Sequence, residues 1–191
     1  MLYFFGDSLT YGHGLPDCCT DNGGPGPTPS LMSWPSLVSN ELGVEYTNLA
    51  RPGCSNQRML YELRQRSFDK HDIVVIMWSF YRRSFIPRSD GLIDIGPWVN
   101  DLEQFYEFHD DVALRYQSLM VMEHAQLWLA YRDLPYIMYS GHAYEDRVLD
   151  SMVSAHFEHH IIDIAADNMH PGVLSHQSWS KESLTHLRPL V

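Results

Sequence analysis

Five short apolar runs along the chain are typical of buried strands. Residues 73–77 read Ile-Val-Val-Ile-Met, a continuous run with β-branched side chains, which is the pattern of a central parallel strand buried on both faces. The run at residues 2–5 ends at Gly6 and Asp7, as a strand followed by a turn does. The five predicted strands lie at residues 2–5, 44–49, 72–78, 135–139 and 161–164.

Helical patterns alternate with these strands. Ser33 is a good N-cap residue, Pro35 falls in the first turn that follows, and Gly43 is a stop signal. The longest helical pattern is interrupted near His109 and Asp110. The predicted helices lie at residues 34–42, 56–68, 98–131, 145–152 and 174–187.

Two stretches rich in glycine and proline are predicted to be long loops. Residues 12–29 hold nine of the chain's 12 Gly and 11 Pro residues, and residues 80–96 form the second stretch. The alternation of strands and helices over 191 residues predicts a single α/β domain, residues 1–191, with a parallel sheet covered on both faces. In such sheets the chemistry sits at the carboxyl ends of the strands.

The charge balance excludes two classes of partner. Thirteen Lys and Arg stand against 24 Asp and Glu, a net charge of −11, so the chain lacks the basic surface that nucleic acids and anionic membranes require. No apolar run approaches the roughly 20 residues that cross a bilayer, so we expect no membrane insertion. The three cysteines are an odd number, and Cys18 adjoins Cys19, which predicts free thiols.

Three polar motifs each follow a predicted strand. A serine at a strand-to-helix turn exposes its hydroxyl and its backbone N–H, and a glycine in a neighbouring loop lets a ligand approach the backbone. An aspartate three residues before a histidine can hold one ring nitrogen while the other faces the serine, which is the logic of an activated hydroxyl nucleophile. The motifs occupy residues 6–12, 48–56 and 167–172.

In this order, Gly-Asp-Ser-Leu, a loop glycine and Asp-x-x-His-Pro resemble the GDSL or SGNH hydrolases, and the resemblance covers the whole chain. It implies a three-layer, flavodoxin-like α/β/α sandwich and a serine esterase, lipase, thioesterase or carbohydrate deacetylase activity. By this resemblance Ser8 is the nucleophile, His170 the general base and Asp167 the carboxylate that orients it. The backbone N–H groups of Ser8 and Gly53 match two donors of the oxyanion hole.

One element of the family pattern is missing. The family usually has Gly-x-Asn-Asp after the third strand, whereas residues 78–81 read Trp-Ser-Phe-Tyr here. Phe80 cannot donate a hydrogen bond, and losing one oxyanion donor typically costs about 10²–10³ in rate. Asn56 is the favoured stand-in because its amide is the right chemical type, with Ser79 and Asn168 as other options. Some stand-alone members that resemble phage-encoded proteins also lack this block.

Side chains beside the three motifs are candidates for substrate recognition, and we select Asp7, Ser79 and Arg82. Loop arginines form either a local basic rim for a carboxylate or phosphate, or exposed pairs with acids such as Asp90. Aromatic residues near the loops form either a platform for a sugar or acyl chain, or part of the core. The arginines are Arg51, Arg82, Arg83 and Arg88, and the aromatic residues are Trp34, Trp78, Tyr81 and Trp98.

A histidine cluster does not predict a metal site. No Cys-x-x-Cys or His-Glu-x-x-His accompanies it, so we expect neither a metal nor a cofactor. No basic leader precedes the first strand, so we expect a cytoplasmic or phage-associated protein rather than a secreted one. The histidines are His142, His156, His159 and His160.

The sequence thus predicts a serine hydrolase of a carboxylic ester on a small molecule or carbohydrate. A small acyl group such as acetyl is favoured because no long apolar lid is evident. The alternative is an SGNH-fold binding or structural protein with little or no catalysis, motivated by Phe80. Acyl transfer to an alcohol other than water would use the same residues.

Overall fold

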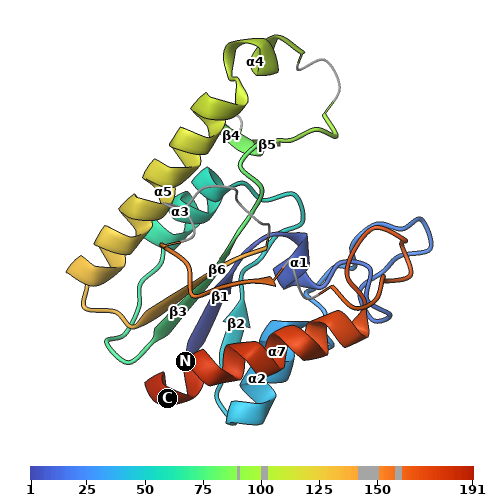
Figure 1. Cartoon of the computed structure of the whole chain (residues 1–191), viewed down its shortest axis with the longest axis vertical. Helices are drawn as coiled ribbons and strands as arrows, with labels where there is room; N and C mark the ends of the chain where they lie inside the picture. Colours follow the sequence, from blue (N-terminus) through green and yellow to red (C-terminus); the bar gives the residue numbers. More distant parts are fainter. Residues whose placement is uncertain (90, 100–102, 142–150, 158–160) are drawn as a thin grey trace.

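The computed structural model describes residues 1–89, 91–99, 103–141, 151–157 and 161–191. A five-stranded parallel sheet of order β2-β1-β3-β6-β7 forms its centre (Figure 1). The predicted fold class and the five-stranded parallel sheet are therefore confirmed. The strands are β1 (Leu2–Phe5), β2 (Tyr46–Asn48), β3 (Ile73–Trp78), β6 (Tyr136–Ser140) and β7 (Ala155–His156).

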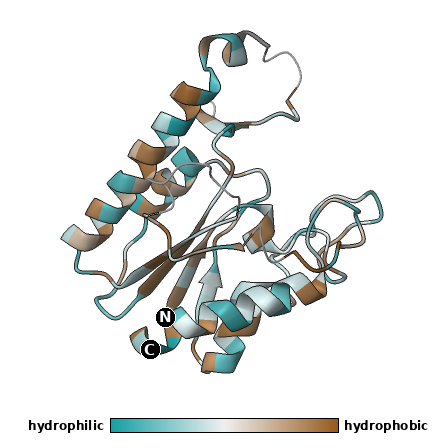
Figure 2. Cartoon of the chain, viewed as in Figure 1, coloured by the Kyte–Doolittle hydropathy of each residue, from teal (hydrophilic) through white to brown (hydrophobic). Residues whose placement is uncertain are grey.

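Helices cover both faces of the sheet and create two apolar layers. Side chains of β3 point alternately to the two layers, Val74 and Ile76 into one and Val75 and Met77 into the other. Apolar residues concentrate along the strands, whereas the helices mix apolar and polar positions (Figure 2). One layer is closed by α3 (Asn56–Arg64) and α5 (Asp111–Tyr131), and the other by α2 (Trp34–Leu42) and α7 (Val173–Leu187).

Most helix boundaries follow the sequence signals. Helix α2 covers the predicted residues and ends at Gly43, whose φ of +66° is left-handed. The predicted interruption of the long helix is confirmed, because the Asp110 carboxylate accepts the Ala113 N–H at 2.8 Å and starts α5 after α4 (Glu103–Phe108). The predicted helix at residues 145–152 lies almost entirely outside the described residues.

The predicted strand at residues 161–164 is wrong. The fifth strand is β7, which pairs with β6 and forms one edge of the sheet. Residues 161–164 instead run beside the start of α7, where the Asp163 carbonyl accepts the Gly172 N–H at 2.9 Å. Ile162 and Ile164 are 61% and 56% exposed, so this apolar run is not part of the core.

The predicted loop at residues 80–96 also needs correction. It contains an antiparallel ribbon of β4 (Ser84–Arg88) and β5 (Gly91–Ile95). Pro87 lies within β4 opposite Leu92. A separate two-stranded ribbon has free edges and tolerates a proline that a central strand would not, which is why the Gly and Pro signals were misleading here.

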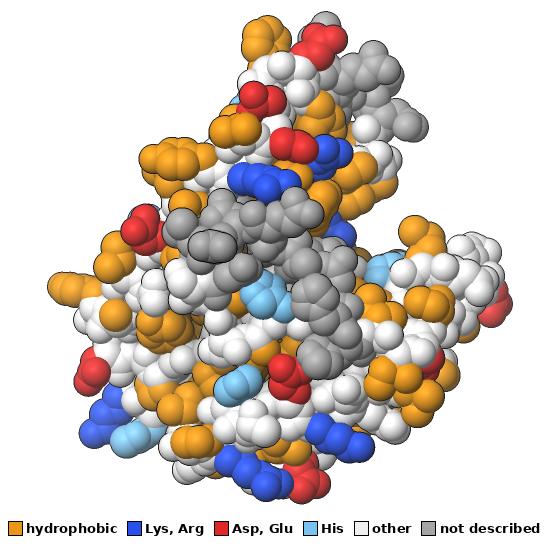
Figure 3. Space-filling model, viewed as in Figure 1, with side chains coloured by type: hydrophobic (Ala, Val, Ile, Leu, Met, Phe, Trp, Pro, Cys, Tyr) orange, Lys and Arg blue, Asp and Glu red, His pale blue; other side chains and the backbone are white. Residues whose placement is uncertain are grey.

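Charged side chains of both signs lie near one another on the surface. On the face drawn in Figure 3, the Lys and Arg side chains of the described residues lie in small groups among Asp and Glu. Cys18, Cys19 and Cys54 are all free thiols. None of the helices in the described ranges is both long and apolar enough to cross a membrane.

His176 is a buried histidine that makes the fold sensitive to acid. Its Nδ1 accepts the Trp34 N–H at 3.2 Å and so joins α7 to the start of α2. Burial lowers the pKa of His176 to about 3, although Asp163 acts in the opposite direction. The unfolded chain, with a His pKa of about 6.5, binds one more proton between these two values.

We therefore expect the free energy of unfolding to fall as the pH drops from about 6.5 towards 3, by up to about 1.4 kcal/mol per pH unit from this group. Urea denaturation of wild type and His176→Asn across this range measures the effect. The exposed His124 on α5 gives a matched control, His124→Asn. If the wild type and His176→Asn lose stability with the same slope, His176 is not the acid-sensitive group.

Candidate active site

Three loops meet at the carboxyl edge of the sheet because of the strand order. The loops after β2, β1 and β3 follow adjacent strands. The backbone joins two of them directly, since the Arg51 N–H donates to the Gly6 carbonyl at 3.0 Å and the Leu49 N–H donates to the Phe4 carbonyl at 2.8 Å. The loops after β1 and β2 therefore carry two of the three predicted motifs side by side. The third motif, residues 167–172, does not directly follow a strand of the described sheet, because the strand predicted at residues 161–164 is not formed.

Ser8 is the first residue of the short helix α1 (Ser8–Tyr11), directly after β1. Asp7 caps this helix, because its Oδ1 accepts the Leu9 N–H at 2.9 Å. Ser8 is only 5% exposed, so the helix start is held within the protein. Within the described part of the chain, the Ser8 N–H has no acceptor, which leaves it available for an oxyanion.

Gly53 lies in a tight turn of the loop after β2. The Cys54 N–H donates to the Arg51 carbonyl at 3.0 Å, Pro52 holds the second position, and Gly53 has a φ of +78°. Proline followed by a residue of positive φ is the signature of a type II turn. The turn hydrogen bond does not use the Gly53 N–H, and no acceptor for it is found among the described residues.

Gly53 is also tightly packed. A Cβ at this position would lie 3.1 Å from Cζ2 of Trp98. We expect Gly53→Ala to lower kcat by about 10²-fold, because relieving that contact and the positive φ shifts the backbone N–H by a fraction of an ångström or more. Steady-state hydrolysis of a nitrophenyl ester measures it.

The matched control for this prediction is Gly43→Ala. Gly43 has a similar φ of +66°, but no atom lies within 4 Å of its Cβ position. The Gly43→Ala variant therefore has the same backbone strain, about 1–2 kcal/mol, but no contact like that with Trp98 and no place in the candidate site. Equal kcat values for the two variants would contradict a role for Gly53 in the oxyanion hole.

Asp167 and His170 form a closely bonded pair at the turn before α7. His170 Nδ1 lies 2.5 Å from Asp167 Oδ2. Asp167 Oδ1 accepts the backbone N–H groups of Met169 and His170, both at 3.0 Å. Asn168 takes a left-handed φ of +59° inside this turn, which asparagine tolerates better than most residues. The motif thus folds on itself and fixes the imidazole.

The electrostatics of the pair favour an ionised carboxylate. Burial raises the pKa of Asp167, but the N–H groups of His170 and Met169 and the His170 ring outweigh it, so the pKa lies below its usual value. An ionised Asp167 holds the proton on Nδ1 and leaves Nε2 as the base. The carboxylate packs on Gly14, where a Cβ would come within 2.8 Å of it.

This contact places the pair beside the loop that follows Ser8. The Ala166 N–H donates to the Gly14 carbonyl at 3.3 Å, and the Ser8 carbonyl accepts the N–H groups of Gly12 and His13. The His170–Asp167 turn therefore rests on the residues that directly follow α1. The Asp167–His170 pair thus contacts the segment that follows Ser8, and the catalytic roles of Ser8, Gly53, Asp167 and His170 stay predictions.

His13 is a second imidazole in this site that the sequence analysis did not single out. Its ring lies 4.3 Å from that of His170 between centroids, and its Nε2 lies 3.9 Å from Asp167 Oδ2. Nε2 also contacts the Gly23 carbonyl at 2.9 Å. His13, Asp167 and His170 offer three possible metal-ligand atoms within 4.8 Å of one another. The absence of a metal cofactor stays a prediction.

Asn56 does not face the oxyanion. Its Oδ1 accepts the Ser79 N–H at 2.7 Å, and its Nδ2 donates to the Ser79 carbonyl at 3.0 Å and to the Ser118 hydroxyl at 3.2 Å. Both amide hydrogens are thus engaged in a fully buried position. We correct the predicted role accordingly: Asn56 fixes the backbone that follows β3.

The proposed substrate contacts Asp7 and Ser79 are also buried, at 1% and 0% exposure. The Ser79 hydroxyl donates to Asp7 Oδ2 at 2.7 Å. Arg82 forms a two-pronged pair with Asp111, at 2.8 and 2.6 Å, on the surface. The predictions for Asp7 and Ser79 therefore need correction, since both are buried and support the loop that holds Ser8. The predicted substrate contact of Arg82, whose side chain is 46% exposed beside Asp111, stays a prediction.

The other candidates divide between core and site. Trp34 and Trp78 are fully buried in the core and Tyr81 nearly so, whereas Trp98 is 51% exposed beside Gly53. Arg51 pairs with Glu62 at 3.0 Å. Asn168 is part of the Asp167 turn. The remaining candidates Asp90, His142, His159 and His160 lie outside the described residues.

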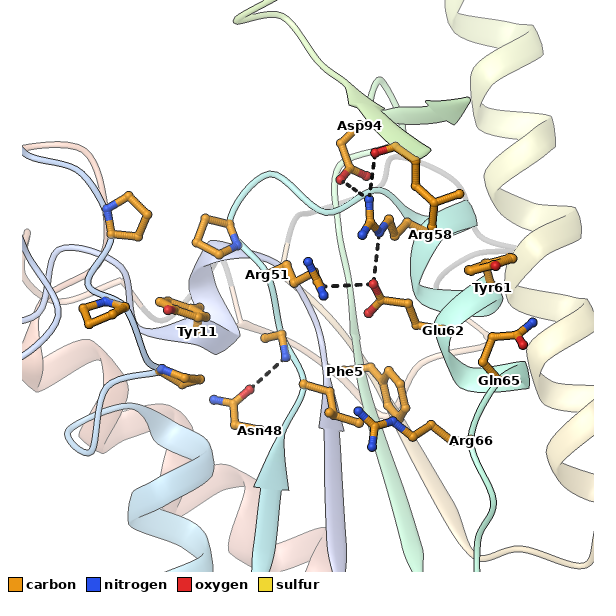
Figure 4. A pocket seen from close by; sticks show the side chains of 17 residues that line it. Phe5, Tyr11, Asn48, Arg51, Arg58, Tyr61, Glu62, Gln65, Arg66 and Asp94 are labelled. Atoms are coloured by element: carbon orange, nitrogen blue, oxygen red, sulfur yellow. Dashed lines mark hydrogen bonds and ion pairs between the residues drawn. The ribbon is translucent and has the colours of Figure 1, made fainter. Parts of the chain in front are cut away.

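A cavity of about 810 Å³ opens beside the loop that carries Gly53 (Figure 4). Its lining includes four prolines, and Tyr11 and Tyr61 of α3 lie on opposite sides of it. Between them, Arg51 and Arg58 each lie 3.0 Å from Glu62. Its lining residues do not include Ser8 or His170, so the cavity adjoins the site and does not contain the reacting atoms.

Comparisons by sequence find no relatives: no family model and no curated protein matches the chain. Comparisons with solved structures find proteins of similar fold. An acetyl xylan esterase, Est2A, from Butyrivibrio proteoclasticus superposes with a TM-score of 0.65 at 13% identity, covering 98% of this chain and 63% of that one. A family two carbohydrate esterase from Clostridium thermocellum in complex with cellohexaose has a TM-score of 0.60 at 14% identity, with coverages of 98% and 63%.

A smaller protein matches over its whole length. A lipolytic protein of the G-D-S-L family from Desulfitobacterium hafniense has a TM-score of 0.51 at 11% identity, and the match covers 96% of this chain and 97% of that one. The chain spans slightly less than two thirds of the two carbohydrate esterases. These neighbours confirm the resemblance at the level of the fold, which is that of the SGNH hydrolases.

Proposed function

We propose that the protein is a serine esterase that cleaves carboxylic esters, with a carbohydrate ester as the favoured substrate. The observation that carries this proposal is the Asp167–His170 pair resting on the residues that follow Ser8. The backbone N–H groups of Ser8 and Gly53 add to it, because both lack acceptors within the described ranges. A nucleophile, a fixed base and two oxyanion donors are the minimum for acyl transfer.

In this mechanism Ser8 Oγ attacks the ester carbonyl while His170 Nε2 takes the hydroxyl proton. The carbonyl oxygen becomes an oxyanion and accepts hydrogen bonds from the N–H groups of Ser8 and Gly53. As the intermediate collapses, His170 returns the proton to the leaving alcohol and an acyl-enzyme remains on Ser8. Water then attacks the acyl carbon while His170 takes its proton. As the bond from Ser8 Oγ to the acyl group breaks, His170 returns that proton to Oγ and the carboxylic acid leaves.

The fold neighbours and the cavity both support a carbohydrate ester. An acetyl xylan esterase and a cellohexaose complex occur among those neighbours. The cavity beside Gly53 presents aromatic and proline rings together with charged groups, a combination that suits a polar ligand with apolar ring faces. An alcohol acceptor in place of water would give acyl transfer by the same residues, and product analysis separates the two.

The test combines turnover and covalent labelling. Short-chain nitrophenyl esters and a panel of acetylated oligosaccharides report hydrolysis, and a fluorophosphonate probe followed by peptide mapping reports an activated serine. We expect turnover of acetyl esters and labelling at Ser8. No turnover and no labelling, together with tight binding of an oligosaccharide, would instead establish the alternative, a non-catalytic binding protein.

A further inference from the structure

The loop after β3 is where SGNH hydrolases usually supply the asparagine of the oxyanion hole, and in this chain it folds back on itself. The Arg83 N–H donates to the Phe80 carbonyl at 3.1 Å, which reverses the chain. Asn56 holds the backbone of Ser79 at both its N–H and its carbonyl. The result is that the side chain of Arg83, rather than that of Phe80, returns towards Ser79.

Arg83 is anchored to the residue that precedes Ser8. Its Nη1 lies 2.5 Å from Asp7 Oδ2 and 2.7 Å from the Ser79 hydroxyl. Asp7 is the residue before Ser8 and caps the helix that Ser8 begins. The Arg83 side chain is 15% exposed, so part of it still reaches solvent.

Trp98 connects this cation to the other oxyanion donor. The Arg83 guanidinium carbon lies 5.1 Å from the Trp98 ring centroid, a cation–π distance. The same indole packs against Gly53 at the position where a Cβ would be. Arg83 therefore contacts the neighbour of Ser8 on one side and the ring that covers Gly53 on the other.

The guanidinium has donors to spare. An arginine carries five N–H hydrogens, and only Nη1 has hydrogen-bond partners among the residues that the structure describes. Resting on the proposed esterase function, we infer that Arg83 provides the third stabilising contact to the oxyanion. A positive charge with free N–H groups replaces the neutral amide of the usual asparagine, which explains why Phe80 is tolerated.

A simpler role must be separated from this one. Arg83 also neutralises Asp7, a buried carboxylate that is costly to leave unpaired, so Arg83→Met alone slows the enzyme under either explanation. Asp7→Asn removes that charge and keeps a capping residue. The double variant Arg83→Met with Asp7→Asn therefore lacks the cation without exposing a buried charge.

The experiment compares wild type, Asp7→Asn, Arg83→Met and the double variant, with thermal melting as a check on folding. With a nitrophenyl acetate substrate, we expect the double variant to have a kcat about 10²–10³-fold below that of Asp7→Asn, with KM little changed. The fluorophosphonate labelling rate at Ser8 should fall with kcat, since that probe also develops an oxyanion-like charge.

The outcomes separate the two proposals. If the double variant turns over as fast as Asp7→Asn, Arg83 serves only to neutralise Asp7 and the inference is overturned. If Arg83→Met does not fold, the comparison of the double variant with Asp7→Asn still decides the question. If wild type neither hydrolyses esters nor labels at Ser8, the esterase function itself fails, which is a different result from an active enzyme indifferent to Arg83.

Discussion

Ser8→Ala is expected to reduce kcat for ester hydrolysis by about 10⁶-fold, the loss seen when the nucleophile of a serine hydrolase is removed. Without Oγ there is no acyl-enzyme, and neither His170 nor the oxyanion donors have an attacking group to assist. The fold should tolerate the change, because Ala is a better helix former than Ser and Asp7 keeps the cap of α1. Burst and steady-state kinetics with a nitrophenyl ester measure the effect.

Ser36→Ala is the matched control for this variant. Ser36 is also a buried serine in the first turn of a helix, α2, and it does not belong to any of the three predicted motifs. It should retain the wild-type kcat and melting temperature. A Ser8→Ala enzyme that keeps turnover within tenfold of the Ser36→Ala control would show that another group is the nucleophile.

The sequence was sufficient for the parts of the fold that depend on local pattern. The apolar run of β3 could only be satisfied by burial on both faces, and Asp110 could cap a new helix wherever the chain went next. The same kind of reasoning failed at residues 161–164. That run is apolar too, but β7 pairs with the edge of β6 instead. β7 has only two residues, one apolar and one polar, which is too short a pattern to predict a strand from the sequence.

The candidate site also combines local signals with long-range contacts. Ser8, Gly53, Asp167 and His170 could be proposed from the sequence because each belongs to a short motif, and their roles stay predictions. The role of Asn56 could not, because its amide is consumed by Ser79, which is 23 positions away in the sequence. That contact depends on the tertiary structure, which brings the start of α3 to the residue after β3. Residue type alone therefore suggested an oxyanion donor, whereas the Asn56 amide holds the backbone of Ser79.

Arg83 and Arg82 illustrate the limit most clearly. They are adjacent and chemically identical, and both follow β3, so no sequence argument separates them. The turn from Phe80 to Arg83 sends one guanidinium to Asp7, whereas Asp111 at the start of α5 takes the other. Side-chain direction after a turn is a property of the three-dimensional packing, and a difference of one residue decides which arginine reaches the site.

Asp167→Asn is expected to lower kcat by about 10⁴-fold, with little change in KM. Two backbone N–H groups donate to Asp167 Oδ1, so an asparagine at this position keeps its carbonyl oxygen there and turns its amide towards His170 Nδ1. An amide N–H facing Nδ1 forces the proton onto Nε2. His170 can then no longer accept the Ser8 proton, and the base is lost while the site keeps its shape.

The chain offers a control aspartate with similar backbone hydrogen bonds and, within the described residues, no hydrogen bond to a histidine ring. Asp163, four residues earlier, also accepts backbone N–H groups, from Leu174 and Ser175 at 3.1 and 2.8 Å. Asp163→Asn should cost stability at the start of α7 but leave kcat near the wild-type value, because it does not touch the His170 ring. If Asp163→Asn and Asp167→Asn slow hydrolysis equally, the effect comes from the fold of this segment. A loss confined to Asp167→Asn, in contrast, follows from the tautomer of His170, since the two substitutions remove the same charge from neighbouring turns.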